Sequence, residues 1–329
     1  MESSAVFRYL SLAVVTVATI TAPAAPAQPY PSRPIELVSH NSPGGGTDII
    51  ARVVAEILVK EKLVSVPVNV INKPGGGGTI AYTYLKSKHG DPHTIMSVGS
   101  MAMLSQVVRP ELDLGFEHYT PLAFLAQDPQ ALMVVGDSPF RSLKDLLDTA
   151  KREPNTLVAS VASAGGTARM LVWMMEKEAG GRYKVVTNKG GGDAIMQVLG
   201  GHTHFSTENI AEGRASVEAK KLRVLAVTSL KRQPLVPESP TFKELGLDIH
   251  MGTERGFAMP AGVPKETVAH MQALLRKVYD SPAWKQHAER SLYENIWMGS
   301  AEYGKHLVAR AAQVREFQTA IGLLKPPAQ

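Results

Sequence analysis

Four glycine-rich loops, each placed between a short apolar run and a helical pattern, are the segments of this chain best suited to chemistry. They read SPGGGTD over 42–48, KPGGGGT over 73–79, SAGGTA over 163–168 and NKGGGDA over 188–194. Glycine-rich turns that open helices expose backbone N–H groups, which bind phosphate or carboxylate groups. One such turn usually needs glycine only for a positive φ angle, but four of one kind indicate a shared anion site.

The loops lack the motifs of nucleotide-binding proteins. None of them has the Lys and Ser or Thr that follow the second glycine of a phosphate loop. The dinucleotide pattern G-x-G-x-x-G also fails, because Ile49, Ile80 and Ile195 occupy its last position. A helix N-terminus can instead hold a carboxylate through charge-assisted hydrogen bonds. Asp48 and Asp193 stand at helix starts; capping alone or capping with ligand contact is open for Asp48, and capping is favoured for Asp193.

Composition predicts a globular protein with enough apolar material for two domains. The chain has 329 residues, of which 44% are hydrophobic. Its net charge of +5 is spread along the chain, which favours acidic small ligands over nucleic acid. It has no cysteine, and it lacks G-x-S-x-G and H-E-x-x-H motifs. His202 and His204 have no evident third ligand and are interpreted as an exposed strand edge. We therefore expect neither a catalytic site nor a metal or cofactor.

The first residues have the pattern of an export signal. Arg8 precedes an apolar stretch over 9–20, and small residues end at Ala27. A membrane anchor is the alternative, but the apolar stretch is shorter than the roughly 20 residues that span a bilayer, and Pro23 and Pro26 stand shortly after its end. No later segment is apolar enough to span. We expect residues 1–27 to be removed and the mature protein to be soluble and exported.

After the signal, β-like runs alternate with helical patterns, which is typical of parallel βαβ units. The alternation predicts an α/β protein with two doubly wound lobes. Lobe I is expected to comprise residues 28–125 and 255–329, and lobe II residues 126–254. In such folds, ligands bind beyond the carboxyl ends of the strands and between domains. We therefore expect the glycine loops to border a ligand cleft between the lobes.

Several motifs together resemble one family. In chain order they are YPSRPIELVSHNSPGGGTDIIAR, VNVINKPGGGGTIAY, VASVASAGGTAR, NKGGGDAIMQVLGG, LRVLAVTS and GFAMPAGVP. The chain is similar to the Bug-type, TctC-like substrate-binding proteins of tripartite tricarboxylate transporters over nearly all of its mature length. The resemblance implies a monomeric periplasmic receptor with the type II Venus-flytrap architecture. It also implies a small carboxylate ligand and membrane permease subunits as partners, without nucleic acid.

The resemblance also implies the ligand-binding residues. The first two loops would grip one end of the ligand, and lobe II would bind the other. The residues carried over by position are Pro43, Gly44, Gly45, Gly46, Thr47, Asp48, Pro74, Gly75, Gly76, Gly77, Gly78, Thr79, Ser163, Gly166, Thr167, Lys189, Gly190 and Asp193.

Three positions depart from the family pattern and bear on ligand identity. Asn188 replaces a common Tyr, Glu208 a common Asp, and Glu254 a frequent Trp. Glu254 and Arg255 stand together at the expected return into lobe I. Because neighbouring residues of a strand face opposite sides, we expect one of the two to face the cleft. An arginine there can pair with a second carboxylate, which favours a di- or tricarboxylate or an amino-acid-like acid.

Two other functions stay open from the sequence. The same cleft suits a periplasmic enzyme that acts on a small carboxylate, or a ligand sensor that feeds a signalling partner. Recovery of the ligand chemically unchanged after incubation with the protein would distinguish a receptor from an enzyme.

We predict that the exported chain begins at Gln28. Ala25 and Ala27 supply the small residues that signal peptidase requires. N-terminal sequencing of protein recovered from the periplasm tests this, and an intact Met1 retained in the membrane fraction would contradict it.

Overall fold

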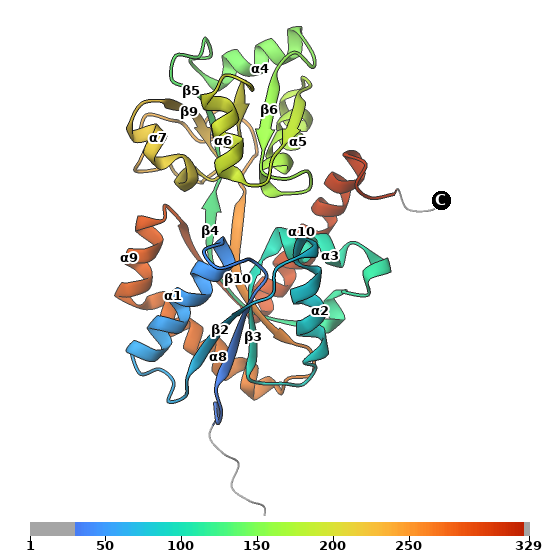
Figure 1. Ribbon diagram of the computed structural model, residues 1–329, viewed down its shortest axis with the longest axis vertical. Helices are drawn as coiled ribbons and strands as arrows, with labels where there is room; N and C mark the ends of the chain where they lie inside the picture. The colour runs from blue at the N-terminus through green and yellow to red at the C-terminus, as the bar shows by residue number, and fades with distance from the viewer. Residues whose placement is uncertain (1–29, 326–329) are drawn as a thin grey trace, which may run out of the picture.

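The computed structural model describes residues 30–325, so the export signal expected over 1–27 lies outside the described residues. Figure 1 shows two α/β lobes stacked along the long axis, each built around one β-sheet. The expected two-lobed α/β fold is confirmed. No helix within 30–325 has the length and apolar character needed to cross a membrane.

Lobe I contains a six-stranded sheet with the order β11-β4-β10-β3-β1-β2. Its strands are β1 (Ile35–Ser39), β2 (Val68–Asn72), β3 (Thr94–Gly99), β4 (Tyr119–Pro129), β10 (Gly252–Pro260) and β11 (Glu294–Gly299). β1 is parallel to β2 and β3, as βαβ units require. β10 is antiparallel to both β3 and β4, and β11 is antiparallel to β4. The sheet is mixed because the strand that returns from lobe II enters it in the opposite direction.

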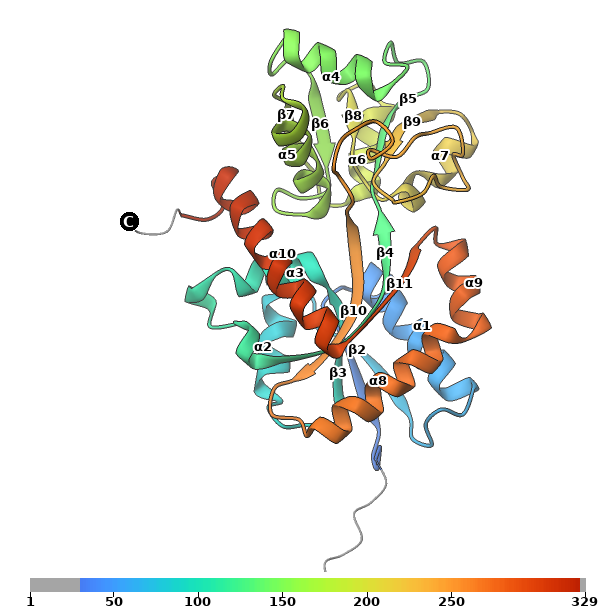
Figure 2. The same cartoon turned by 180° about the vertical axis from the view of Figure 1, so that it is seen from behind.

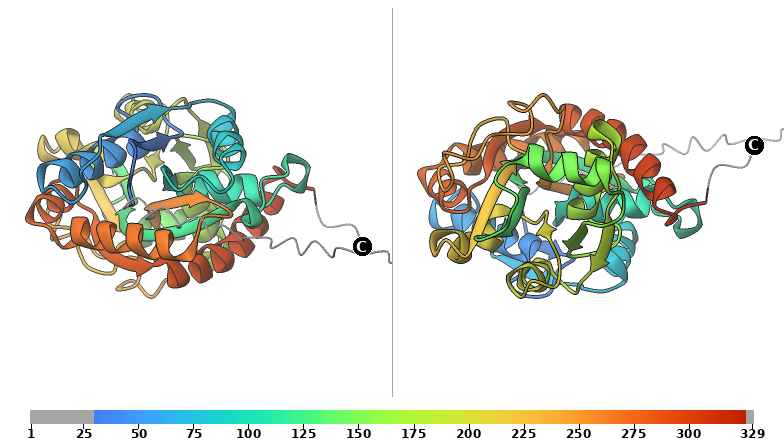
Figure 3. Two further views of the ribbon diagram at one scale, coloured as in Figure 1. Left: turned by 90° about the horizontal axis from the view of Figure 1, so that it is seen from below. Right: turned by 90° about the horizontal axis from the view of Figure 1, so that it is seen from above.

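Helices cover both faces of this sheet. They are α1 (Gly46–Lys60), α2 (Thr79–Ser87), α3 (Ser100–Val107), α8 (Lys265–Asp280), α9 (Pro282–Arg290) and α10 (Ser300–Ala320). Neighbouring strand residues enter separate cores: Leu37 and Phe257 pack with α1, α8 and α9, whereas Val38 and Ala258 pack with α2, α3 and α10. Side chains that alternate across each strand produce this division. Views along the long axis show the helices around the strands (Figure 3).

Lobe II is smaller and has the strand order β7-β6-β8-β5-β9. Its strands are β5 (Ala131–Val135), β6 (Val158–Val161), β7 (Lys184–Thr187), β8 (Phe205–Ser206) and β9 (Leu222–Val227). Its helices are α4 (Leu143–Arg152), α5 (Thr167–Ala179), α6 (Gly191–Leu199) and α7 (Arg214–Glu218). β6 is parallel to β7 and β8, whereas β5 is antiparallel to β8 and β9. Short 3-10 turns lie at Gly76–Gly78, Pro110–Leu112, Phe116–His118 and Ile210–Gly213.

The lobes are joined by β4 and β10, which pair along their whole length. The ladder runs from Tyr119 opposite Pro260 to Pro129 opposite Gly252, and β5 of the second sheet begins at Ala131. The boundaries proposed from the sequence, after residues 125 and 254, fall inside these two strands. The hydrogen-bonded ladder therefore continues from lobe I to the edge of lobe II.

The C-terminal helix α10 belongs to both lobes. Tyr303 and Leu307 are fully buried in a core of lobe I, whereas Phe317 is fully buried in a core of lobe II. The rings of Phe317 and Trp173 lie 5.7 Å apart between centroids. Figure 2 shows α10, in red, running from lobe I toward α5. The helix is therefore a third connection between the lobes. The prediction from the sequence assigned the whole C-terminal segment to lobe I and did not include this connection.

We predict that Phe317→Ala lowers the free energy of unfolding by about 3–5 kcal/mol, because it removes a fully buried ring. Val308→Ala is the matched control: Val308 lies on the same helix but is 59% exposed, so its loss is expected to change stability little. Urea denaturation of both variants measures the effect. Equal stability of the two variants would show that the end of α10 does not contribute to the core of lobe II.

Candidate functional site

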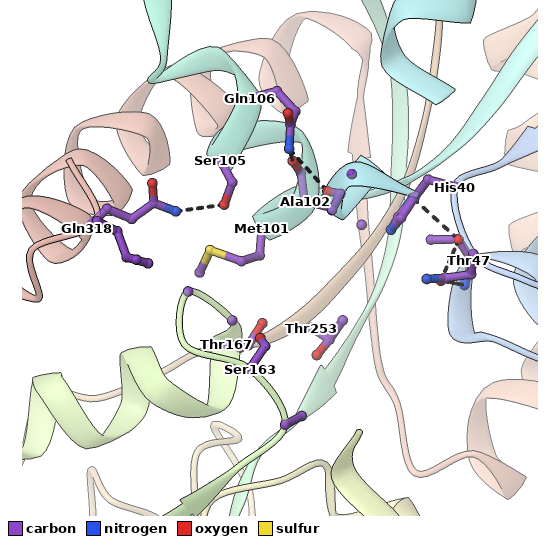
Figure 4. A pocket seen from close by; sticks show the side chains of 18 of the residues that line it. His40, Thr47, Met101, Ala102, Ser105, Gln106, Ser163, Thr167, Thr253 and Gln318 are labelled. Atoms are coloured by element: carbon purple, nitrogen blue, oxygen red, sulfur yellow. Dashed lines mark hydrogen bonds between the residues drawn. The ribbon is translucent and has the colours of Figure 1, made fainter. Parts of the chain in front are cut away.

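A cavity of about 500 Å³ lies between the lobes, within the size range of small-molecule sites. Figure 4 shows it between the first two glycine loops, α3, α10 and the loop that follows β6. Its lining residues are His40, Asn41, Thr47, Gly76, Gly77, Gly99, Met101, Ala102, Ser105, Gln106, Arg109, Ala162, Ser163, Gly165, Gly166, Thr167, Thr253, Arg255, Gln318 and Leu323.

The structure brings together only part of the predicted site. The predicted residues that line the cavity are Thr47, Gly76, Gly77, Ser163, Gly166, Thr167 and Arg255. The predicted residues outside its lining are Pro43, Gly44, Gly45, Gly46, Asp48, Pro74, Gly75, Gly78, Thr79, Lys189, Gly190, Asp193 and Glu254. Three of the four glycine loops therefore border the cavity, and the fourth does not.

The first glycine loop places Thr47 at the cavity wall. The Thr47 hydroxyl donates to Asn41 Oδ1 at 2.7 Å, and the same oxygen accepts from the Thr47 backbone N–H at 3.1 Å. The Ser39 hydroxyl lies 2.9 Å from that of Thr47. The side chain is thus fixed by the end of β1, before any ligand binds.

Asp48 is buried and supports this loop from behind. Its carboxylate accepts hydrogen bonds from the backbone N–H of Gly44 and from Arg52 and Asn72, at 2.8 to 2.9 Å. Burial raises the pKa of Asp48, but these hydrogen bonds outweigh burial and bring it to about 2. Because its oxygens bind the protein, the structure supports a role in holding the loop.

The second glycine loop has a backbone conformation that other residues adopt rarely. All four glycines from Gly75 to Gly78 have positive φ angles. Gln106 of α3 fixes the loop: its Nε2 donates to the Gly77 carbonyl at 3.1 Å, and its Oε1 accepts from the Thr79 hydroxyl at 2.7 Å. Thr79 therefore helps to fix the loop through Gln106, while Gly76 and Gly77 expose their backbone to the cavity.

Lobe II contributes the loop between β6 and α5. Ser163 packs against Gly166 so closely that a Cβ at position 166 would lie 2.3 Å from the Ser163 hydroxyl oxygen. Thr167 is the first residue of α5, the N-cap is Gly166, and no side chain caps this helix. Thr167 therefore caps no helix, and it lines the cavity.

The fourth glycine loop lies apart from the cavity. Lys189 and Asp193 are both exposed, and Gly190 is the N-cap of α6. No side chain caps α6, so the capping role favoured for Asp193 is not present.

Glu254 and Arg255 point to opposite sides of β10. Glu254 is buried and accepts from His306 Nε2 of α10 at 2.9 Å, and Arg310 Nε lies 3.2 Å from it. Arg255 lines the cavity and pairs with buried Asp128 of β4 at 2.8 Å.

Two further ionisable groups near the cavity are kept neutral. Burial and the positive charge of Arg255 lower the pKa of His40 to about 4. Glu208 is buried and accepts from the Ala162 N–H at 2.6 Å. Burial, together with the charge of Glu212, raises the pKa of Glu208 to about 8. At neutral pH Glu208 is therefore uncharged. It does not offset the positive charge of the arginines that line the cavity.

Several lining residues were missed from the sequence. His40 and Asn41 directly precede the first loop, and Gly99 ends β3, so the rule that ligands bind at carboxyl ends of strands could have found them. Ser105 and Gln318 lie on helices with ordinary patterns. Their sequence carries no signal of a site.

Within the described residues, no group of three His, Asp or Glu ligand atoms lies at the cavity. Within 30–325, the group that could hold an ion is Asp113, Glu117 and His118, which lies outside the cavity lining and where Lys86 already pairs with Asp113. His204 Nδ1 accepts from the Val158 backbone N–H at 3.0 Å, so its role is structural.

Comparisons with known proteins agree with a two-lobed binding protein. The family model described as "Tripartite tricarboxylate transporter family receptor" matches residues 50–323. A Cupriavidus necator protein, the UPF0065 protein in the gbd 5' region, is 28% identical over 306 residues, which cover 92% of this chain and 91% of that protein.

Solved structures show the same architecture. A TctC solute-binding protein from Polaromonas, solved without ligand, superposes with a TM-score of 0.76 at 28% identity, covering 88% of this chain and 99% of that one. A Rhodopseudomonas palustris protein with adipate superposes with a TM-score of 0.74 at 24% identity, covering 89% of this chain and 98% of that one.

The fold and the interlobe cavity define a periplasmic-type solute-binding protein. The chain belongs to the tripartite tricarboxylate transporter family of receptors, as the resemblance implied. Its relatives are solute-binding proteins.

The raised pKa of Glu208 predicts a pH dependence of stability. The folded state holds this proton up to about pH 8, whereas the unfolded chain loses it near the ordinary value of 4.5. The free energy of unfolding should therefore fall as pH rises through this window, by on the order of a few kcal/mol. Glu208→Gln keeps an acceptor for Ala162 and should remove this part of the decline.

Chemical denaturation at several pH values between 4.5 and about 8 measures how the free energy of unfolding changes with pH in the parent and in the variant. Glu178→Gln, at an exposed position of α5, is the control and should keep the parental slope. A parental slope in Glu208→Gln would show that Glu208 ionises normally in the folded protein.

Proposed function

We propose that this receptor captures a small carboxylate and delivers it to the membrane permease subunits of a tripartite tricarboxylate-type transporter. The observation that carries the proposal is the charge of the cavity wall: it contains Arg109 and Arg255 and has no Asp or Glu among the described residues. Such a wall favours an anion over a neutral or cationic solute.

Helix N-termini around the cavity support the same conclusion. The N-caps of α1, α3 and α5 are all glycines that provide no side-chain cap, although Asn41 Oδ1 accepts from the Thr47 N–H of α1. By contrast, α4 and α9 are capped by Ser142 and Ser281. Uncapped N-termini leave backbone N–H groups available and carry partial positive charge. Carboxylate oxygens would satisfy these donors.

Thr47 and Thr167 line the cavity from opposite lobes and are further candidate ligand contacts (Figure 4). Thr47 is fixed by lobe I, and Thr167 begins a helix of lobe II. A ligand that contacts both would stabilise the closed arrangement of the lobes. The adipate in the R. palustris structure is a dicarboxylate, which supports this class of ligand. The proposal comprises a monomeric periplasmic receptor that does not bind nucleic acid and does not alter its ligand.

Isothermal titration calorimetry of purified protein with a panel of small carboxylates tests the function. We predict that Thr167→Val weakens the best carboxylate of the panel by about tenfold or more, because one hydrogen bond to a charged group is lost. Thr167→Ser retains the hydroxyl and should bind within about threefold of the parent. Since Thr167 caps no helix, the melting temperature of the valine variant should not fall.

A lower melting temperature with unchanged affinity in Thr167→Val would contradict the ligand contact. NMR of the carboxylate after prolonged incubation with the protein should show it unchanged; conversion would favour an enzyme. Mass spectrometry of small molecules released by denaturing the purified protein would identify the natural ligand.

A further inference from the structure

The cavity is long enough to separate two polar ends. Figure 4 shows His40 and Thr47 at one end and Ser105 and Gln318 at the other, with Met101 beside Ser105. The first end carries the first glycine loop, where the proposed function places one carboxylate. A ligand that extends to the second end meets a different set of groups, which the sequence did not indicate.

Ser105 presents a hydroxyl group at the far end. Its oxygen accepts from Gln318 Nε2 at 2.8 Å. This bond leaves the Ser105 proton without an acceptor among residues 30–325, and the residue lines the cavity. Ser105 is therefore placed to donate to a ligand, and Gln318 sets the direction of that donation.

Gln318 is held firmly enough to serve this positioning role. It is 1% exposed and follows Phe317, the residue that anchors α10 in lobe II. Its backbone carbonyl accepts from the N–H groups of Leu323 and Leu324. A Cβ on Gly165 would lie 3.6 Å from Gln318 Nε2, so the lobe II loop packs beside it.

Arg109 adds positive charge to the cavity wall. It lies four residues beyond Ser105, just after the end of α3, and both line the cavity. No carboxylate among residues 30–325 lies within 4.0 Å of its guanidinium group. Arg255 differs, because its charge is balanced by buried Asp128. Arg109 is therefore the arginine of the described wall whose charge is available to a second anionic group.

We propose that Ser105 and Arg109, with Gln318 as a positioning residue, form a distal subsite that selects ligands with a second carboxylate. The inference rests on the proposed function, because the first carboxylate is assigned to the glycine-loop end. The sequence pattern assigned the second carboxylate to Glu254 or Arg255. The distal subsite instead assigns it to residues on α3, just after α3 and on α10.

Calorimetry with matched pairs of ligands tests the subsite. The probes are straight-chain dicarboxylates from succinate to suberate, each paired with the monocarboxylate of the same carbon count. The parent should bind the best dicarboxylate at least about tenfold more tightly than its partner. In Arg109→Gln and Ser105→Ala this ratio should fall to within about threefold, while affinity for the monocarboxylate stays near the parental value.

Arg315→Gln is the control, because it removes the same charge from an exposed position on α10. It should retain the parental ratio, which separates contact at the subsite from a general change in net charge. Equal binding of mono- and dicarboxylates by the parent, or an unchanged ratio in both variants, would overturn the subsite and leave the receptor function intact. Failure of the parent to bind any carboxylate would contradict the proposed function and the subsite together.

Discussion

The rest of the structure depends on the buried ion pairs that two residues of β10 form with its neighbours. Arg255 pairs with Asp128 on the neighbouring strand, and Glu254 pairs with His306 and approaches Arg310 on α10. Breaking a buried pair leaves an uncompensated charge, which is strongly destabilising. These contacts therefore fix β10 to both β4 and α10 at the position where the chain re-enters lobe I. They also decide which charge reaches the cavity.

Glycine has two distinct uses around the cavity. In the second loop, consecutive positive φ angles require it. In the first loop, close packing requires it, because a Cβ on Gly46 would lie 2.5 Å from Arg255 Nη1. Both uses leave glycine, which has no capping side chain, at the N-caps of α1 and α2, and the lining Thr47 and Thr167 stand within the first turns of α1 and α5. Backbone donors are thus concentrated where the wall lacks acidic groups.

Much of this arrangement follows from the sequence, and the remainder depends on packing between distant segments. Alternating strand and helix patterns predicted both lobes, and the glycine loops predicted Thr47 and Thr167 at the cavity. Local sequence does not show which face of a helix meets a ligand, so Ser105 and Gln318 were missed. Asp193 illustrates the reverse case: its loop has the right composition, but α6 begins away from the cavity. The sequence also could not separate Glu254 from Arg255, because only the neighbours of β10 distinguish its two sides.

The anchoring of α10 in both lobes has a mechanical consequence. A pair of strands alone permits one body to bend and also to twist against the other. A helix with Leu307 in one core and Phe317 in the other resists the twist and leaves rotation about a single axis. Lobe II is therefore held to lobe I by three segments of chain, which limits how far the donors of the two halves can shift sideways relative to each other.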